Sequence, residues 1–357
     1  MYVSLDNMYV TFPGPADETT ICRVEVHDNN LTAVAQGEVP GQVLNQFSMD
    51  EYGDYFRVAT TTWTTMAIQT NSTVMPPVPS STGTANGTQT SNATAPSTGV
   101  SIGIGIPMVS LISTNVYVLD MNLTIVGKLE NISAGENFHS ARFVGDRCYL
   151  VTFQVTDPLF VVDLTNPTSP TVLGNLTVSG YSDYLQPYDE NHLIGIGKET
   201  TEEESGYFAW YQGIKIAIFD VTNVSNPVQM WNVTIGDRGS DSPVLSDPKA
   251  LLFDKQMDLL VIPITVAQID TNQSGVPPEG AYGTQVWQGV YVYNITLTEG
   301  LLLKGNITHA ETAGMPPSNL TVNRALYIGN ILYTVSQGKI KLNSLADLSP
   351  LKEISLS

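Results

Sequence analysis

A short unit of β-strands and turns recurs along the chain of 357 residues and limits its fold more than any other feature. In the clearest copy, turn residues separate four apolar runs, over 140–144, 148–153, 159–164 and 172–178. Four antiparallel strands within about 40–45 residues are typical of one blade of a β-propeller.

Five further copies of the unit can be recognised from turns of Gly, Asp and Asn, each followed by an apolar strand. Helical periodicity is almost absent. The sequence therefore predicts an all-β fold: a single β-propeller of four-stranded antiparallel blades. Six repeats are visible, and more blades upstream of residue 1 are an open alternative. The predicted blades cover approximately residues 2–39, 47–130, 140–178, 184–235, 249–307 and 324–356.

Three insertions interrupt these repeats, each between a second and a third strand. A low-complexity Ser/Thr/Pro/Gly insertion covers 64–112, and loop insertions cover 199–212 and 267–288. The composition of 71–99 predicts a flexible tract. Because neighbouring strands alternate in direction, all three insertions should share one face with the loops that join blades. Loops on a rigid scaffold are the usual place for recognition, so we expect a ligand on that face.

The charge of the chain excludes one class of partner. The formal net charge is −19 and only 14% of residues are charged, whereas nucleic-acid binding needs clustered Lys and Arg. We therefore predict no nucleic-acid partner. The segment 237–241 could offer oxygens to Ca²⁺ but lacks the spacing of an EF-hand loop. We predict no cofactor, with Ca²⁺ as the alternative.

Asn-x-Ser/Thr sequons are more frequent than composition predicts, with thirteen where about four are expected by chance. This excess predicts an exported glycoprotein, although Thr-rich strand ends also create sequons by accident. The candidate glycosylation sites are Asn30, Asn71, Asn86, Asn92, Asn122, Asn131, Asn175, Asn223, Asn232, Asn272, Asn294, Asn306 and Asn319.

The start of the chain has neither the basic nor the apolar region of a signal sequence. No stretch reaches the roughly 18 apolar residues that a membrane helix needs. We therefore expect an extracellular or cell-surface protein whose signal sequence lies upstream of residue 1. The two cysteines, Cys22 and Cys148, lie in apolar runs and are predicted to be free thiols.

Polar residues recur at the starts of the first strands, the positions that line the channel of a propeller. The ligand-binding candidates are Asp50, Glu51, His139, Arg142, Tyr184, Asp247, Lys249 and Arg324. These residues could line a funnel that binds a glycan or a peptide terminus. The alternative is that their charges pair between adjacent blades and maintain the geometry of the ring.

Hydrolytic machinery has little support in the sequence. His139 and Ser140 are adjacent, so on a regular strand they should point to opposite faces rather than form a dyad. No His-Glu-x-x-His spacing occurs. His139 and His309 are the one pair that we consider for a metal. We assign no catalytic residue, and the metal ligands are unknown.

Several segments resemble a family of secreted archaeal proteins with a C-terminal β-propeller distantly related to WD-type repeats. They include Leu44 to Tyr52, Arg142 to Arg147, Leu193 to Gly197, Phe219 to Val221 and Asn330 to Ser336. The similarity covers nearly the whole chain outside the insertions. It implies the propeller fold and export, and the family has additional propeller sequence at its N-terminus. It implies no particular activity.

These observations lead to one expected function and one rival. We expect an extracellular or cell-surface binding or structural module that presents loops for protein or glycan recognition. The rival is an extracellular hydrolase or lyase that acts on polysaccharide or peptide from the central funnel, an idea that rests on fold analogy.

Overall fold

The computed structural model describes all residues except 28–29, 68–107, 154–156, 203–208, 271–279 and 357. By its internal contacts the chain divides into a main unit, residues 1–62 and 112–357, and a second unit, residues 63–111. Most of the second unit, including the tract 71–99 that is predicted to be flexible, lies outside the described residues.

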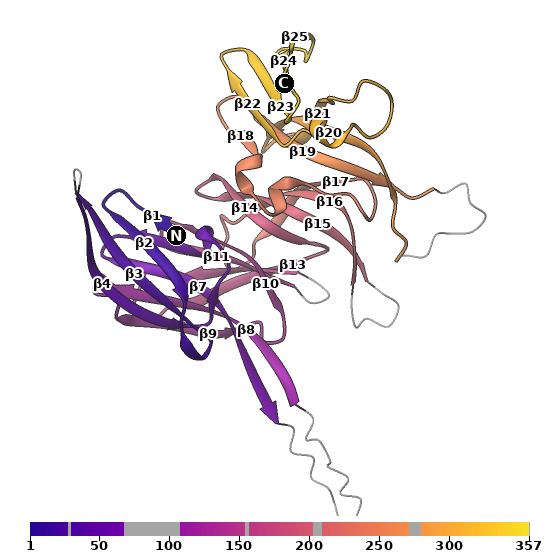
Figure 1. The fold of residues 1–357 in the computed structure, drawn as a ribbon. Coiled ribbons are helices and arrows are strands. Elements are labelled where there is room, and N and C mark those ends of the chain that lie inside the picture. The colour runs from indigo at the N-terminus through magenta and orange to yellow at the C-terminus, as the bar shows by residue number, and fades with distance from the viewer. Residues whose placement is uncertain (28–29, 68–107, 154–156, 203–208, 271–279, 357) are drawn as a thin grey trace, which may run out of the picture. The chain divides into compact units, whose positions relative to one another are not determined.

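The main unit consists of six antiparallel sheets in chain order, which we call blades 1 to 6 (Figure 1). Blade 1 comprises β1 (Tyr2–Val3), β2 (Asn7–Pro13), β3 (Glu18–His27) and β4 (Asn30–Pro40). Blade 2 comprises β5 (Gln42–Val43), β6 (Met49–Tyr52), β7 (Tyr55–Ala67), β8 (Met108–Asp120) and β9 (Ile125–Ile132). Blade 3 comprises β10 (Asn137–Val144), β11 (Arg147–Phe153), β12 (Asp157–Asp163) and β13 (Thr171–Val178).

Blade 4 comprises β14 (Tyr181–Asp189), β15 (His192–Glu202), β16 (Ala209–Asp220) and β17 (Val228–Ile235). Blade 5 comprises β18 (Leu252–Asp254), β19 (Leu259–Gln268), β20 (Thr284–Thr296) and β21 (Gly300–Ile307). Blade 6 comprises β22 (Arg324–Ile328), β23 (Ile331–Val335), β24 (Lys339–Ser344) and β25 (Pro350–Ser355). Short 3₁₀ turns are η1 (Pro15–Asp17), η2 (Gln46–Ser48), η3 (Pro243–Leu245), η4 (Pro248–Ala250) and η5 (Ser318–Leu320). The prediction of an all-β fold built from six such repeats is confirmed. In blade 2, β5 and β6 share the first-strand position, and both pair with β7.

Glycine turns join the first and second strands in three of the blades. Gly53, Gly145 and Gly329 have φ angles of 58°, 54° and 59°. A two-residue hairpin with a positive φ at its first central residue favours Gly there, because a side chain would be strained. These are three of the six turns that mark the repeats in the sequence.

Five hydrophobic clusters hold consecutive blades together, one at each junction. At the junction of blades 3 and 4, Val161 packs with Leu193 and Phe219, and all three side chains are buried. The blades therefore pack face to face, with their second and third strands supplying most of the core.

An extra residue interrupts the pairing of the third and fourth strands in all six blades. The extra residues are Val34, Val126, Leu173, Met230, Lys304 and Leu351. Each produces a β-bulge, in which two residues of one strand oppose one residue of its partner. The bulge gives a fixed reference point for comparing positions between blades.

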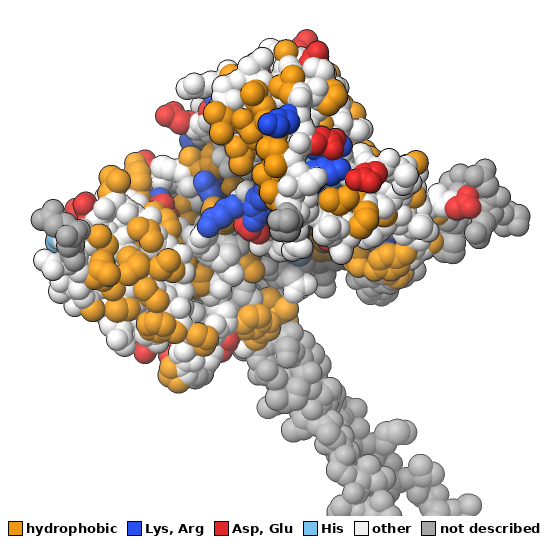
Figure 2. Space-filling model, turned by 45° about the horizontal axis from the view of Figure 1, so that its top comes forward, with side chains coloured by type: hydrophobic (Ala, Val, Ile, Leu, Met, Phe, Trp, Pro, Cys, Tyr) orange, Lys and Arg blue, Asp and Glu red, His pale blue; other side chains and the backbone are white. Residues whose placement is uncertain are grey.

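The insertions lie where the chain passes from β7 to β8, from β15 to β16 and from β19 to β20, always from second to third strand. Parts of the predicted loop segments are strand: β15 continues to Glu202, and β16 begins at Ala209. Both cysteines are free, with Cys148 buried and Cys22 half-buried. No helix among the described residues could cross a membrane. Charged side chains are sparse on the face shown in Figure 2.

Candidate functional site

Asp50, on β6, forms an ion pair within its own blade. It pairs across the strands with Arg57 of β7, whose Nε donates to the Asp50 carboxylate over 3.1 Å. The same guanidinium donates a 2.7 Å hydrogen bond from Nη1 to the carbonyl of Gly145 in blade 3. Arg57 therefore connects a predicted site residue to the next blade.

Glu51, the next residue, joins blade 2 to blade 1. Its Oε2 accepts hydrogen bonds from Ser4 Oγ and Asn7 Nδ2, both at 3.0 Å, and from Tyr9 Oη at 2.6 Å. Burial and the Glu51 carboxylate raise the pKa of Tyr9, so its hydroxyl remains a donor. One carboxylate oxygen of Glu51 is thus occupied by groups of this chain.

His139 and Ser140 both contact blade 4. A register shift between Phe138 and Ser140 in the pairing of β10 with β11 breaks the regular alternation, so the expectation of opposite faces is wrong here. His139 Nδ1 lies 2.9 Å from Asp183 Oδ1, and Ser140 Oγ donates over 2.6 Å to the carbonyl of Ser182. The two side chains have different partners and form no dyad.

Asp247 pairs with Arg324 across the junction of blades 5 and 6. Its Oδ1 also accepts a 3.1 Å hydrogen bond from the backbone N–H of Lys249 and so caps η4. The Lys249 side chain is exposed. Tyr184 is buried, with its hydroxyl 2.6 Å from Gln186 Oε1, and burial raises its pKa.

Arg142 differs from the candidates Asp50, Glu51, His139, Asp247 and Arg324, whose side chains have charged or hydrogen-bonding partners. Among the described residues the Arg142 guanidinium has no hydrogen-bond or ion-pair partner, whereas Arg57 and Arg324 each pair with a carboxylate. Its Cζ lies 5.1 Å from the centroid of the Phe47 ring, within the range of a cation–π contact. The positive charge of Arg142 is therefore available to a ligand.

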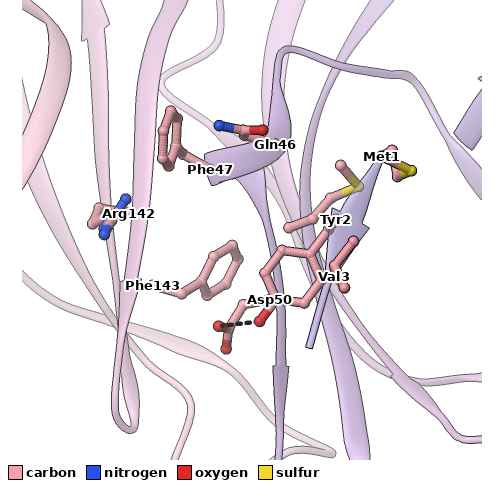
Figure 3. A pocket seen from close by; sticks show the side chains of 9 residues that line it. Met1, Tyr2, Val3, Gln46, Phe47, Asp50, Arg142 and Phe143 are labelled. Atoms are coloured by element: carbon pink, nitrogen blue, oxygen red, sulfur yellow. Dashed lines mark hydrogen bonds between the residues drawn. The ribbon is translucent and has the colours of Figure 1, made fainter. Parts of the chain in front are cut away.

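Arg142 lines a pocket of about 450 Å³ together with Asp50, Tyr2, Phe47 and Phe143 (Figure 3). Further lining residues are Met1, Val3, Gln46 and Met49. The close-up shows the Tyr2 hydroxyl bonded to Asp50, at 3.3 Å, with the Phe143 ring between that pair and Arg142. Two candidates from the sequence thus share one pocket, whose walls come from blades 1 to 3.

Phe47 is a site residue that the sequence analysis missed. It lies in η2, where the Asn45 side chain accepts a 2.9 Å hydrogen bond from its backbone N–H. Its ring stands 5.2 Å from that of Tyr184. An Asn two residues before an aromatic residue, in a loop that leads into a first strand, is the signal that could have revealed it.

A second group that the sequence analysis missed surrounds Arg238. Its Cζ lies 4.3 Å from the ring centroid of Trp210, 4.9 Å from that of Tyr211 and 4.2 Å from that of Tyr282. The hydroxyls of Tyr211 and Tyr282 are 2.6 Å apart. The hydrogen bond with Tyr211 and the nearby guanidinium lower the pKa of Tyr282. Trp210 and Tyr211 come from the end of the insertion 199–212, and Tyr282 comes from the insertion 267–288. Aromatic residues within these insertions were the sequence signal that could have revealed the group.

The metal candidates are separated in the fold. Asp237 accepts a 2.8 Å hydrogen bond from Ile269 N, and Asp241 lies 3.4 Å from Lys198 Nζ. His139 lies at the junction of blades 3 and 4, whereas His309 is buried between blades 5 and 6, 2.9 Å from both Ser336 Oγ and Thr334 Oγ1. In the described part of the chain no three His, Cys, Asp or Glu residues are grouped closely enough to hold a metal.

Comparison with known proteins shows the relationships of the chain. A family model described as "Beta propeller domain" matches residues 1–348. An uncharacterized protein of Methanocaldococcus jannaschii is 30% identical over 76% of this chain and 37% of its own length. An uncharacterized protein of Archaeoglobus fulgidus is 30% identical over 65% of this chain and 28% of its own. The chain thus spans well under half the length of these relatives.

Among solved structures, a protein from Lactobacillus plantarum is similar with a TM-score of 0.48 and 10% sequence identity. The similarity covers 99% of this chain and 83% of that one.

Proposed function

Because the chain belongs to the beta propeller domain family, we propose that it is an extracellular or cell-surface binding module. In this proposal the pocket at Arg142 takes the carboxylate of a ligand, either a peptide C-terminus or an acidic sugar of a glycan. The excess of sequons supports the extracellular location.

The unpaired guanidinium of Arg142 carries the proposal. The chain has 34 acidic and 15 basic residues, so carboxylates for internal pairing are plentiful. An arginine that remains without one, at the wall of a pocket, can offer parallel N–H donors to an incoming carboxylate. The same group adds little to stability, since it makes no charge pair in the fold.

The other walls suit a ligand with an apolar part beside its carboxylate. Phe47 and Phe143 supply ring faces and edges, and Gln46 supplies an exposed amide. Small-molecule sites commonly combine aromatic walls with a few polar groups that set orientation. The Asp50 charge is already compensated by Arg57, which limits its repulsion of an anionic ligand.

Hydrolysis has weaker support at this pocket. Glycoside hydrolysis ordinarily uses two carboxylic groups on either side of the scissile bond. The lining of the described pocket includes one carboxylate, Asp50, and Arg57 holds it. Binding without turnover therefore fits the arrangement better, and ligand cleavage is an outcome that the experiment below can detect.

The test measures binding of matched ligand pairs by titration calorimetry. Peptides with a free or an amidated C-terminus form one pair, and uronate-containing or neutral oligosaccharides form the other. We expect the free carboxylate of one pair to bind, and Arg142→Gln to weaken that binding about tenfold or more. Arg147→Gln, which alters an arginine outside the pocket, is the matched control and should bind as the parent protein does.

Equal affinity of the parent protein and Arg142→Gln, with both variants folded by circular dichroism, would contradict the proposal. So would equal binding of the charged and uncharged ligand in both pairs. Mass spectrometry of the recovered ligand reports on catalysis: shortened products would establish the hydrolase instead.

A further inference from the structure

The fourth strand of each blade lies at the edge of its sheet. Such a strand presents unpaired N–H and C=O groups that can template pairing with another chain. Natural proteins protect these edges with charged residues, Pro or bulges. Here every fourth strand has the bulge, so the residues that follow it occupy equivalent positions in the six blades.

The residue two positions after the bulge is polar in every blade. These residues are Gln36, Lys128, Asn175, Asn232, Asn306 and Glu353 in blades 1 to 6. The residues a further two positions on are Glu38, Glu130, Thr177, Thr234, Thr308 and Ser355. The same two structural positions therefore include at least one charged residue in blades 1, 2 and 6 and form an Asn-x-Thr sequon in blades 3, 4 and 5.

The side chains at these sequons are accessible. Asn175, Asn232 and Asn306 are all exposed, and so are Thr177 and Thr234. Residues two apart on a strand point to the same side, so Asn175 and Thr177 share one face of β13, and Asn232 and Thr234 share one face of β17.

Two of the three strands with these sequons lack other protection, whereas β21 carries Lys304. β13 (TVLGNLTV) and β17 (VQMWNVTI) contain neither a charged residue nor a proline. By contrast, β9 carries Lys128 and Glu130, which pair at 2.7 Å, and β25 carries Pro350, Lys352 and Glu353.

We propose that Asn175, Asn232 and Asn306 carry N-linked glycans, and that these glycans protect the edges of blades 3 to 5 from pairing with other chains. A hydrated glycan replaces the charges of the other blades as the barrier. The inference rests on the extracellular location in the proposed function and is independent of the pocket at Arg142.

The modification requires a glycan linked to a lipid phosphate as donor. The Asn side-chain nitrogen forms a bond to C1 of the first sugar, and the bond between C1 and the phosphate oxygen breaks. The amide loses one proton, and the lipid phosphate leaves. No electrons are exchanged, so the step needs no oxidant or reductant.

The first experiment is glycopeptide mass spectrometry of the full chain secreted by a host that glycosylates Asn-x-Ser/Thr. We expect glycan mass on the peptides that contain Asn175 and Asn232. Unmodified Asn at both positions would overturn the proposal.

The second experiment separates the glycan from the threonines that specify it. Thr177→Val with Thr234→Val removes both sequons and leaves an uncharged edge, so light scattering should show at least a doubling of the mean mass. Thr177→Lys with Thr234→Lys also removes both glycans but supplies charge, and this variant should stay monomeric. Thr171→Val, on exposed β13 outside the sequon, is the matched control for added hydrophobicity.

Two results would overturn edge protection: a double-Val variant as monodisperse as the parent, or association of the double-Lys variant. Carboxylate binding at Arg142 is measured on the same samples. Its loss or absence in all of them would contradict the proposed function and leave the glycan result unaffected.

Discussion

The hydroxyl of Tyr9 donates a 2.6 Å hydrogen bond to Glu51 and thereby joins blade 1 to blade 2. The Tyr9 ring is fully buried and stacks on Phe56 with 4.0 Å between ring centroids. Ser4 and Asn7 donate to the same carboxylate oxygen. Glu51 therefore serves as an acceptor for three donors of the neighbouring blade.

Replacing either member of this pair should lower the free energy of unfolding. Tyr9→Phe removes a donor to a charged group, and we expect a loss of about 1.5–3 kcal/mol in urea denaturation. Glu51→Ala should cost more, because it leaves several donors without their acceptor. Neither change should alter ligand affinity at Arg142. A neutral effect of both on stability would exclude this contact as a connection between blades.

Breaking the ion pair of Arg57 should be costly, because both partners are largely removed from water. Arg57→Met leaves the Asp50 carboxylate without its cation and the Gly145 carbonyl without its donor, and we expect a loss of about 3–5 kcal/mol. Adding Asp50→Leu should restore part of that stability. A double-mutant cycle measures the coupling, and a coupling energy near zero would contradict the assignment.

Truncating the core between blades 3 and 4 should create a cavity. Phe219→Ala should cost about 3–5 kcal/mol, and Val161→Ala should cost less, because both side chains pack in the same buried cluster. The control is Val172→Ala, an exposed position on β13 that should change stability by no more than about 0.5 kcal/mol. Chemical denaturation of the three variants gives the comparison.

Stability should fall in mildly acidic solution because of His309. Burial, aided by the ammonium groups of Lys341 and Lys339, lowers the pKa of His309 to about 4. The unfolded chain, with a histidine pKa of about 6.5, then binds a proton more readily than the folded chain. The contribution of His309 is therefore complete above about pH 6.5 and is lost as the pH falls toward 4, with a total of order 3 kcal/mol.

Unfolding free energies measured between pH 8 and pH 3.5 test this prediction, and His309→Gln should flatten the curve in that window. Asp189 provides a separate signal. Burial opposes its ionisation, but hydrogen bonds from Lys255 and His192 outweigh this effect and lower the pKa of Asp189 to about 2. The contribution of Asp189 to stability is lost only below about pH 4. Asp189→Asn should therefore leave the pH dependence of the unfolding free energy between pH 8 and about pH 4 unchanged. A parent protein equally stable at pH 7 and pH 4.5 would contradict the account of His309.

Much of the fold could be predicted from the sequence because its signals are local. The strand over 148–153 can be recognised from its consecutive apolar residues, and Gly145 marks the turn that precedes it. Repetition of the same signals at regular spacing then indicates blades. The candidate residues were found in the same way, from their place at the start of first strands.

The partners of those residues could not be predicted, since each pair joins segments far apart in the chain. Tyr9 and Glu51 are 42 residues apart, and Arg324 reaches Asp247 across 77. The packing of neighbouring blades decides which charged side chains find an ion-pair partner. It also decides which side chains, such as Arg142, remain available to a ligand. The cluster around Arg238 likewise assembles rings from two separate insertions.

By itself the sequence determined the all-β class, the six repeats and the thirteen sequons, because strand period, turn chemistry and sequons all lie within a few residues. Tertiary structure alone decided the pocket at Arg142 and the equivalence of Asn175, Asn232 and Asn306. The pocket needs three blades in contact, and the equivalence needs the bulge that sets the register of each edge strand. Both depend on contacts between distant segments, which a pattern along one chain does not contain.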